Sequence, residues 1–269
     1  MATPSGRLAL ITGASAGIGE AFARAYAARG FDLALVARRA DRLEALGEEL
    51  TAAHGVRTLA IPADLSVWEA HLPVLETLDR AGRQVDVLVN NAGFGVPQSF
   101  TAVPWERHRD FLMTLVVSAC GLTYGVIPGM AGRGWGRIVN IASLAAFSPG
   151  AAGYTLYPAA KSFAVKFSQS LDAELRNKGV KVTAVCPGFT KTEFAAASGT
   201  QHLMDQAPRR FWQTPGQVAD AAIAANEAGR VVVVPGWHNK LAAGLMQLLP
   251  DSLLSVLIRS GAAKYQLKD

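Results

Sequence analysis

Cysteine, long apolar runs and clustered charge are all scarce in this chain of 269 residues. The two cysteines, Cys120 and Cys186, have the spacing of neither a metal pair nor a redox dithiol, so we expect free thiols and no metal site. The amino end lacks the basic and apolar blocks of a secretion signal, which favours a cytoplasmic protein. The net charge of +5 comes from scattered basic residues, which argues against a nucleic-acid groove.

Aromatic residues make up only 8% of the chain, whereas apolar residues as a whole make up 50%. This balance, with abundant alanine and glycine, is typical of helices packed closely on a sheet rather than of an aromatic-rich β-sandwich. No internal repeat or low-complexity linker divides the sequence. We therefore expect one domain over residues 1–269.

Short β-rich runs alternate with longer stretches of helical periodicity. The expected strands are 7–12, 32–37, 57–61, 85–90, 136–142, 180–186 and 230–234. The clearest helical stretches are 18–29, 41–53 and 159–177, and Asp41 with Glu44 suggests a capping box at the second of them. This order predicts an α/β fold with a doubly wound, parallel, seven-stranded sheet and helices on both faces.

Two segments break the alternation. Residues 189–212 mix large apolar side chains with small and polar ones, as expected of a substrate lid. Residues 237–269 form an apolar C-terminal extension that Pro250-Asp251 interrupts, so it is too broken for a membrane span. We expect the extension to cover the substrate pocket or a subunit interface, with association at a membrane surface as the less favoured alternative.

A glycine-rich turn follows the first expected strand, in the sequence Thr12-Gly13-Ala14-Ser15-Ala16-Gly17-Ile18-Gly19. Such a turn lets backbone amides at a helix N-terminus approach a pyrophosphate. Taken alone it is also compatible with a simple strand-to-helix turn. The flanking strand and amphipathic helix favour a cofactor site, with these contacts: Gly13, Ser15, Gly17, Ile18 and Gly19.

Three further motifs follow in a fixed order: Asn90-Asn91-Ala92-Gly93, then Ser143 with Tyr157-Pro158-Ala159-Ala160-Lys161, then Pro187-Gly188. Together with the glycine turn, they make the chain resemble the short-chain dehydrogenase/reductase superfamily over residues 6–234. The resemblance implies a Rossmann-type fold, a nicotinamide cofactor, and a homodimer or homotetramer.

The chemistry of ketone reduction fits these residues, because it needs hydride on carbon, a proton on oxygen and polarisation of the carbonyl. Tyr157 and Lys161 are four residues apart, so they share one helix face, where an ammonium lowers the pKa of a nearby phenol. By resemblance, Lys161 also holds the nicotinamide ribose, and Ser143 hydrogen-bonds the substrate oxygen. Taken alone, a serine after a strand is more often an ordinary loop or cap residue, and a tyrosine near a lysine usually lies on a solvated helix face. Only their combination favours a catalytic site. The Ser143–Tyr157 separation is one residue longer than usual in the family, which suggests a small insertion around 150–153.

The end of the second strand decides the choice of cofactor. It carries Arg38 and Arg39, and an arginine fork suits the 2′-phosphate of NADP(H) better than the ribose hydroxyls of NAD(H). A solvated basic turn is the alternative. By resemblance, Asp64 bonds the adenine unless it merely caps a helix, and Asn90 lines the adenosine side. The remaining expected cofactor contacts are Ala92, Gly93, Gly188 and Thr192.

One position departs from the family pattern. The family usually has an asparagine that supports a water behind the lysine, and here the equivalent position is Leu115. A leucine side chain cannot hold a water by hydrogen bonding. Thr114 or Ser118 could substitute, although ordinary helix hydroxyls are the stronger interpretation.

These observations predict an NADPH-dependent carbonyl reductase or secondary alcohol dehydrogenase. Phe94, Phe147 and Tyr154 suggest a bulky apolar ketone or alcohol as substrate, although such side chains are more often core. The alternative is a cofactor-binding regulatory or scaffold protein with weak or no turnover, which the departure at Leu115 suggests and the intact Tyr157–Lys161 pair opposes.

Overall fold

A single parallel sheet organises the chain. The computed structural model describes residues 6–150, 152–199, 201, 208–250 and 252–254. The seven strands have the order β3-β2-β1-β4-β5-β6-β7. Their bounds are β1 Leu8–Thr12, β2 Asp32–Ala37, β3 Thr58–Pro62, β4 Val85–Asn90, β5 Gly136–Ile141, β6 Val180–Val185 and β7 Val232–Val233. The predicted doubly wound α/β fold is confirmed, and all seven expected strands are present to within two residues at each end.

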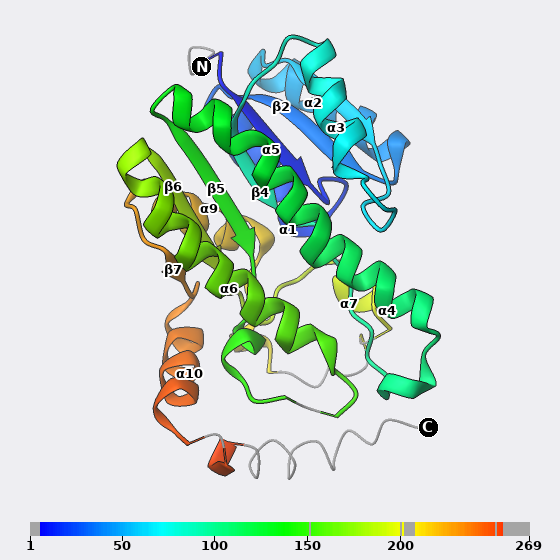
Figure 1. Cartoon of the computed structure of the whole chain (residues 1–269), viewed down its shortest axis with the longest axis vertical. Helices are drawn as coiled ribbons and strands as arrows, with labels where there is room; N and C mark the ends of the chain where they lie inside the picture. Colours follow the sequence, from blue (N-terminus) through cyan, green and yellow to red (C-terminus); the bar gives the residue numbers. More distant parts are fainter. Residues whose placement is uncertain (1–5, 151, 200, 202–207, 251, 255–269) are drawn as a thin grey trace.

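Helices cover both faces of this sheet: α5 and α6 cross its front in Figure 1, and α1 and α9 lie behind it. The helices are α1 Gly17–Ala27, α2 Ala40–His54, α3 His71–Arg80, α4 Trp105–Leu112, α5 Ser118–Gly132, α6 Leu156–Leu175, α7 Phe194–Ala197, α9 Pro215–Glu227 and α10 Trp237–Leu248. Short 3₁₀ turns occupy Phe100–Ala102, Leu144–Phe147, Arg176–Lys178 and Arg209–Phe211.

The strands are apolar almost throughout because both faces of the sheet are buried. On β1, Ala9 and Ile11 pack into the core beneath α1, α2 and α9, whereas Leu8 and Leu10 pack into the core beneath α3, α5 and α6. Alternate residues of one strand thus serve two separate cores. This two-sided packing fixes the strand register that aligns the carboxyl ends of β1, β4, β5 and β6.

The capping box expected at Asp41 is wrong. Helix α2 begins at Ala40, its N-cap residue Arg39 makes no capping hydrogen bond, and Asp41 lies inside the first turn. There a carboxylate still complements the helix dipole. The cap falls earlier because Arg39 keeps an extended backbone and its side chain crosses to the glycine turn.

A continuous helical stretch, Trp105–Gly132, is long and apolar enough to cross a membrane by length and composition alone. This stretch consists of α4, a π-helical turn at Met113–Val117, and α5. Phe111, Leu122 and Met130 are completely buried against the rest of the protein. A core helix passes the same test of length and composition, so this feature is weak evidence for a membrane span.

Candidate active site

The glycine turn connects β1 to α1 with the compact geometry that the sequence predicts. Gly13 and Gly17 have positive φ angles of 65° and 59°, which side chains rarely tolerate. A Cβ on Gly19 would collide with the carbonyl oxygen of Gly13, so the helix packs directly on the turn. The N-cap residue of α1, Ala16, makes no side-chain capping bond, which leaves the first-turn amides without that partner.

Thr12 and Asn91 hold this turn against the end of β4. The hydroxyl of Thr12 donates to the carbonyl of Val89 and accepts from the backbone amides of Asn91 and Ala92. The side chain of Asn91 donates to the carbonyls of Thr12 and Gly13 at 2.9 and 3.3 Å. The sequence placed both residues in motifs without giving either a role. Their role as a link between strands depends on β1 and β4 being neighbours.

The two arginines after β2 have different positions. Arg39 donates to the hydroxyl of Ser15 from Nε at 3.2 Å and from Nη2 at 3.0 Å. Arg38 is exposed and lies close enough to Asp64 for its charge to act on that carboxylate. Of the predicted pair, Arg39 is therefore the arginine at the glycine turn.

Glu193, which sequence reasoning missed, joins Arg39 to a third arginine. Its carboxylate accepts from Arg39 at 2.9 Å and from Arg42 at 2.8 and 3.1 Å. Hydrogen bonds from Arg42 and then Arg39 hold the pKa of Glu193 below its usual range. The arrangement shows that two guanidinium groups can converge on one anion beside the glycine turn.

Asp64 and Asn90, both expected near adenosine, make internal hydrogen bonds. The Asp64 carboxylate accepts from the amide and hydroxyl of Ser66. Burial opposes its ionisation, but these bonds and the charge of Arg38 keep its pKa below the ordinary value. The amide nitrogen of Asn90 donates to Asn140 on β5 at 2.9 Å. The Asn90 side chain therefore points along the sheet edge toward β5.

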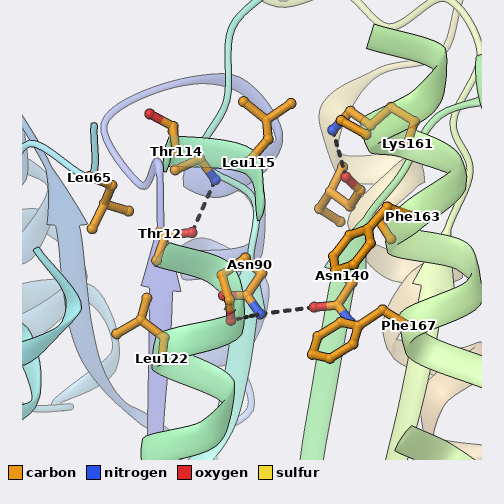
Figure 2. Close-up of a pocket in the computed structure, with 15 residues that line it drawn as sticks. Thr12, Leu65, Asn90, Thr114, Leu115, Leu122, Asn140, Lys161, Phe163 and Phe167 are labelled. Atoms are coloured by element: carbon orange, nitrogen blue, oxygen red, sulfur yellow. Dashed lines mark hydrogen bonds between the residues drawn. The ribbon is translucent and has the colours of Figure 1, made fainter. Parts of the chain in front are cut away.

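Ser143, Tyr157 and Lys161 come together at the carboxyl edge of β5. Ser143 follows the strand and caps the turn at Leu144–Phe147, where its hydroxyl accepts from the amide of Ala145. Tyr157 and Lys161 both lie on α6, as predicted, and the lysine Nζ is 5.6 Å from the centre of the tyrosine ring. That Nζ donates to the carbonyl oxygen of Ile141 at 2.8 Å (Figure 2).

The pKa values of this group differ from the simple expectation. Burial raises the pKa of Tyr157 to about 12, opposed by a hydrogen bond with the Ser143 side chain. Burial lowers the pKa of Lys161 to about 8. The expected lowering of the phenol pKa by the lysine is not seen in this arrangement, because Lys161 directs its ammonium at Ile141. Desolvation dominates both groups.

Leu115 lies in the π-helical turn and is 9% exposed. A Cβ on Gly93 would lie 3.3 Å from the Leu115 side chain. Leu115 therefore packs over the end of the Asn-Asn-Ala-Gly motif. The hydroxyls of Thr114 and Ser118 donate to the carbonyls of Asp110 and Leu65. Thr114 therefore bonds back to its own helix, as an ordinary helix hydroxyl does. Ser118 instead bonds across to the loop after β3.

The segment after β6 reaches back over the site. Thr192 lies against Gly17, where a Cβ would come within 3.0 Å of the threonine side chain. Phe194 places its ring 6.0 Å from that of Tyr157. The hydroxyl of Ser198 accepts from the amide of Gly95 at 2.8 Å, which links this segment to the loop after β4.

Gly188 is required by packing against the C-terminal helix. A Cβ at this position would lie 2.7 Å from Cγ of Asn239 on α10. Asn239 in turn donates to Gln213 and to the carbonyl of Pro235. Part of the predicted C-terminal extension, 237–250, thus supports the base of the segment after β6. Residues 200 and 202–207 of the expected lid, and 251 and 255–269 of the extension, lie outside the described residues.

The residues present fit a dinucleotide cofactor. Asn91 and Gly19 pack directly against the glycine turn. The first amides of α1 lack a side-chain cap, and the guanidinium of Arg39 donates to the hydroxyl of Ser15. These features supply backbone donors and positive charge where a phosphate group would bind. The two thiols are free, Cys186 being buried and Cys120 half-buried. Among the described residues, no cluster of histidine, cysteine or carboxylate side chains could hold a metal ion.

Comparison with known proteins agrees with this geometry. An uncharacterized oxidoreductase from Myxococcus xanthus is 39% identical over 74% of this chain and 78% of its own length. A short-chain dehydrogenase from Sphingobium yanoikuyae, solved in complex with NADPH, has a TM-score of 0.79 and 32% identity, covering 91% of this chain and 96% of that one.

A second solved structure is the bulky-bulky ketone specific alcohol dehydrogenase from Comamonas testosteroni. It has a TM-score of 0.75 and 28% identity, covering 98% of this chain and 95% of that one. The sequence model of the short chain dehydrogenase family matches residues 7–203. The chain therefore belongs to the short-chain dehydrogenase/reductase family of NAD(P)-dependent oxidoreductases.

Proposed function

We propose that this protein is an NADP(H)-dependent carbonyl reductase, reversible as a secondary alcohol dehydrogenase. The observation that carries the proposal is the grouping of Ser143, Tyr157 and Lys161 at the carboxyl edge of β5. In doubly wound folds, ligands bind at this edge of the sheet, next to the point where the strand order reverses between β1 and β4.

Each side chain has a distinct role in the proposed reaction. Bound nicotinamide supplies the hydride. Tyr157 donates the proton to the substrate oxygen, and its raised pKa keeps the phenol protonated at neutral pH. Ser143, whose side chain opposes the rise in the pKa of Tyr157, orients the same oxygen. Lys161, one helical turn further along α6, is the proposed group that returns a proton to Tyr157.

NADP(H) is favoured over NAD(H) because the end of β2 offers cationic donors beside the glycine turn. Arg39 bonds Ser15, and Arg39 with Arg42 already holds one carboxylate between two guanidinium groups. A phosphate needs the same arrangement of donors. The relative from Sphingobium yanoikuyae was solved with NADPH, which supports the same choice for this chain.

A bulky apolar ketone or alcohol is the proposed substrate. The rings of Tyr154 and Phe194 flank Tyr157 at centroid distances of 6.3 and 6.0 Å. Aromatic walls of this kind fit apolar substituents on both sides of a carbonyl. The likeness to the Comamonas testosteroni enzyme supports this class. Residues 189–212 are proposed as the lid over that pocket.

Steady-state assays with a panel of ketones and secondary alcohols test the function, each followed by nicotinamide absorbance with NADPH and NADH in parallel. We expect turnover with substrates that carry two large substituents, and a higher kcat/KM with NADPH. Binding of NADPH without turnover on the whole panel would instead support the regulatory or scaffold role.

Residues 1–269 are further proposed to form one cytoplasmic domain that assembles as a homodimer or homotetramer. Helix α10 exposes an apolar stripe that suits a subunit contact or a pocket cover: Trp237, Leu241, Leu245 and Leu248. Light scattering of the full chain and of a truncation before Leu241 tests the contact.

Association with a membrane surface is the less favoured alternative, and sedimentation with neutral liposomes tests it. Strong sedimentation would contradict the cytoplasmic assignment.

A further inference from the structure

The chain that leaves the sheet after β6 is paired with the chain that returns before α9. The amide of Gln213 donates to the carbonyl of Phe189 at 2.9 Å, and the amide of Lys191 donates to the carbonyl of Gln213 at 3.0 Å. These two bonds form a parallel bridge between Thr190 and Gln213. The path of the chain after β6 is therefore tied to the position of Gln213.

Asn239, in the first turn of α10, holds the side chain of Gln213. Both residues are buried. The Asn239 Nδ2 donates to Oε1 of Gln213 at 3.0 Å and to the carbonyl of Pro235, two residues after β7, at 2.8 Å. A backbone carbonyl can only accept, so the bond to Pro235 also fixes which end of the Asn239 amide carries the donors. Asn239 thus anchors Gln213 to the end of the sheet.

The same amide group packs on Gly188. A Cβ at Gly188 would lie 2.7 Å from both Cγ and Nδ2 of Asn239, so only a glycine lets the amide approach this closely. One buried side chain therefore contacts the chain at Gly188, where it leaves the sheet, and at Gln213, where it returns.

The chain held in this way runs directly to the glycine turn. Thr192 follows Lys191, and its side chain lies 3.0 Å from the position that a Cβ on Gly17 would take. The Thr192 hydroxyl accepts from the amide of Phe194 at 3.2 Å, and the ring of Phe194 lies 6.0 Å from that of Tyr157. A shift of the bridge would therefore move Thr192 relative to both the glycine turn and Tyr157.

We propose that Asn239 is a positioning residue for the nicotinamide end of the cofactor site. It keeps Gly188 and Gln213 in a fixed relation, and through the bridge it keeps Thr192 against the glycine turn. A binding segment that is already ordered gives higher affinity, because less ordering is left to occur on binding. The adenosine end, at Arg39 and Ser15, has contacts of its own. The inference rests on the proposed assignment of Gly188 and Thr192 to the nicotinamide end.

Hydrogen–deuterium exchange of the full chain without cofactor tests the anchor itself. Asn239→Ala removes both side-chain hydrogen bonds, so the amides of Lys191 and Gln213 should exchange about tenfold faster relative to the amides of β1. Asn226→Ala is the matched control, because Asn226 is an equally buried asparagine on α9 that donates to Ile138 and Thr183. The relative rate is expected to be unchanged in the control. An unchanged relative rate in Asn239→Ala would overturn the proposal.

Titration calorimetry with NADPH and with 2′,5′-ADP, which carries the adenosine end alone, tests the positioning role. We expect Asn239→Ala to raise the Kd for NADPH about five- to tenfold and to leave the Kd for 2′,5′-ADP within about twofold. Asn226→Ala is expected to leave both constants unchanged. Equal losses for the two ligands in Asn239→Ala, or no loss for NADPH, would overturn the proposal even if the two amides exchange faster.

Gln213→Met is the second variant if Asn239→Ala fails to fold. It removes the acceptor of the same pair and keeps a side chain of similar volume, so it is expected to give the same selective loss of NADPH affinity. Equal losses or no loss in this variant would count against the proposal in the same way. No ketone takes part in either measurement, so failure of this inference is distinguishable from failure of the proposed reductase activity.

Discussion

The guanidinium of Arg39 lies across the hydroxyl of Ser15, with Nε at 3.2 Å and Nη2 at 3.0 Å from it. This pair joins the residue after β2 to the middle of the glycine turn after β1. Positive charge is thereby held beside the N-terminus of α1, where an anion gains from the helix dipole and from uncapped amides.

Replacing Arg39 with leucine is expected to raise the KM for NADPH about tenfold or more and to leave the KM for NADH nearly unchanged. The reason is the loss of a charge-assisted hydrogen bond to the 2′-phosphate, worth about 1.5–3 kcal/mol. Steady-state kinetics with both cofactors measures the effect. Arg80→Leu, on the exposed surface of α3, is the control. Equal losses with both cofactors would assign phosphate recognition elsewhere.

Glu193→Gln is expected to tighten NADPH binding about two- to fivefold, because Arg39 and Arg42 no longer pair with a competing carboxylate. The effect is small because all three side chains are substantially exposed, and solvent weakens ion pairs at such positions. Titration of the protein with NADPH and with NADH gives the two dissociation constants. An identical change for both cofactors would show that Glu193 acts through the fold and not on the phosphate.

Tyr157→Phe is expected to abolish turnover while leaving NADPH affinity nearly unchanged. The substitution removes the hydroxyl that donates the proton but keeps the ring and its contact with Phe194. Initial rates and a fluorescence titration with NADPH separate the two effects. Turnover close to that of the wild type would assign proton donation to another group.

Lys161→Met is expected to change the pH dependence of stability. The folded protein lowers the pKa of Lys161 to about 8, whereas an unfolded lysine titrates near 10.4, so the unfolded state binds more protons between these values. Wild-type stability should therefore rise with pH across this window, by up to about 3 kcal/mol relative to Lys161→Met. Denaturant unfolding at pH 7, 9 and 10.5 measures the difference. A difference that stays constant with pH would mean that the buried ammonium carries no such penalty.

Leu115→Asn is expected to retain activity, and to increase it where proton delivery limits the rate. Leu115 and Lys161 line one small cavity, to which the new amide would add a polar group, but a buried amide without partners costs about 1–3 kcal/mol. Melting temperature, turnover and the solvent deuterium isotope effect must be measured together. A folded variant with the turnover and isotope effect of the wild type would show that this position does not control proton delivery.

The order and type of the elements followed from the amino-acid pattern alone. Apolar strands bounded by glycine and polar turns, with helices between them, leave few arrangements other than a parallel doubly wound sheet. It also determined which motifs meet, because the carboxyl ends of parallel strands share one edge. The spacing of Tyr157 and Lys161 placed both on one helix face without any knowledge of the fold.

The hydrogen-bond partners of the polar side chains depended instead on the folded arrangement of the chain. The pattern after β2 offered Arg38 and Arg39 equally, and the path of the chain placed Arg39 on Ser15 and Arg38 near Asp64. Asn90, which was expected to line the adenosine side, donates to Asn140, fifty positions along the chain, because β4 and β5 are neighbours. Local periodicity determines secondary structure, whereas hydrogen-bond partners and pKa shifts depend on contacts between residues distant in sequence, which no local pattern encodes.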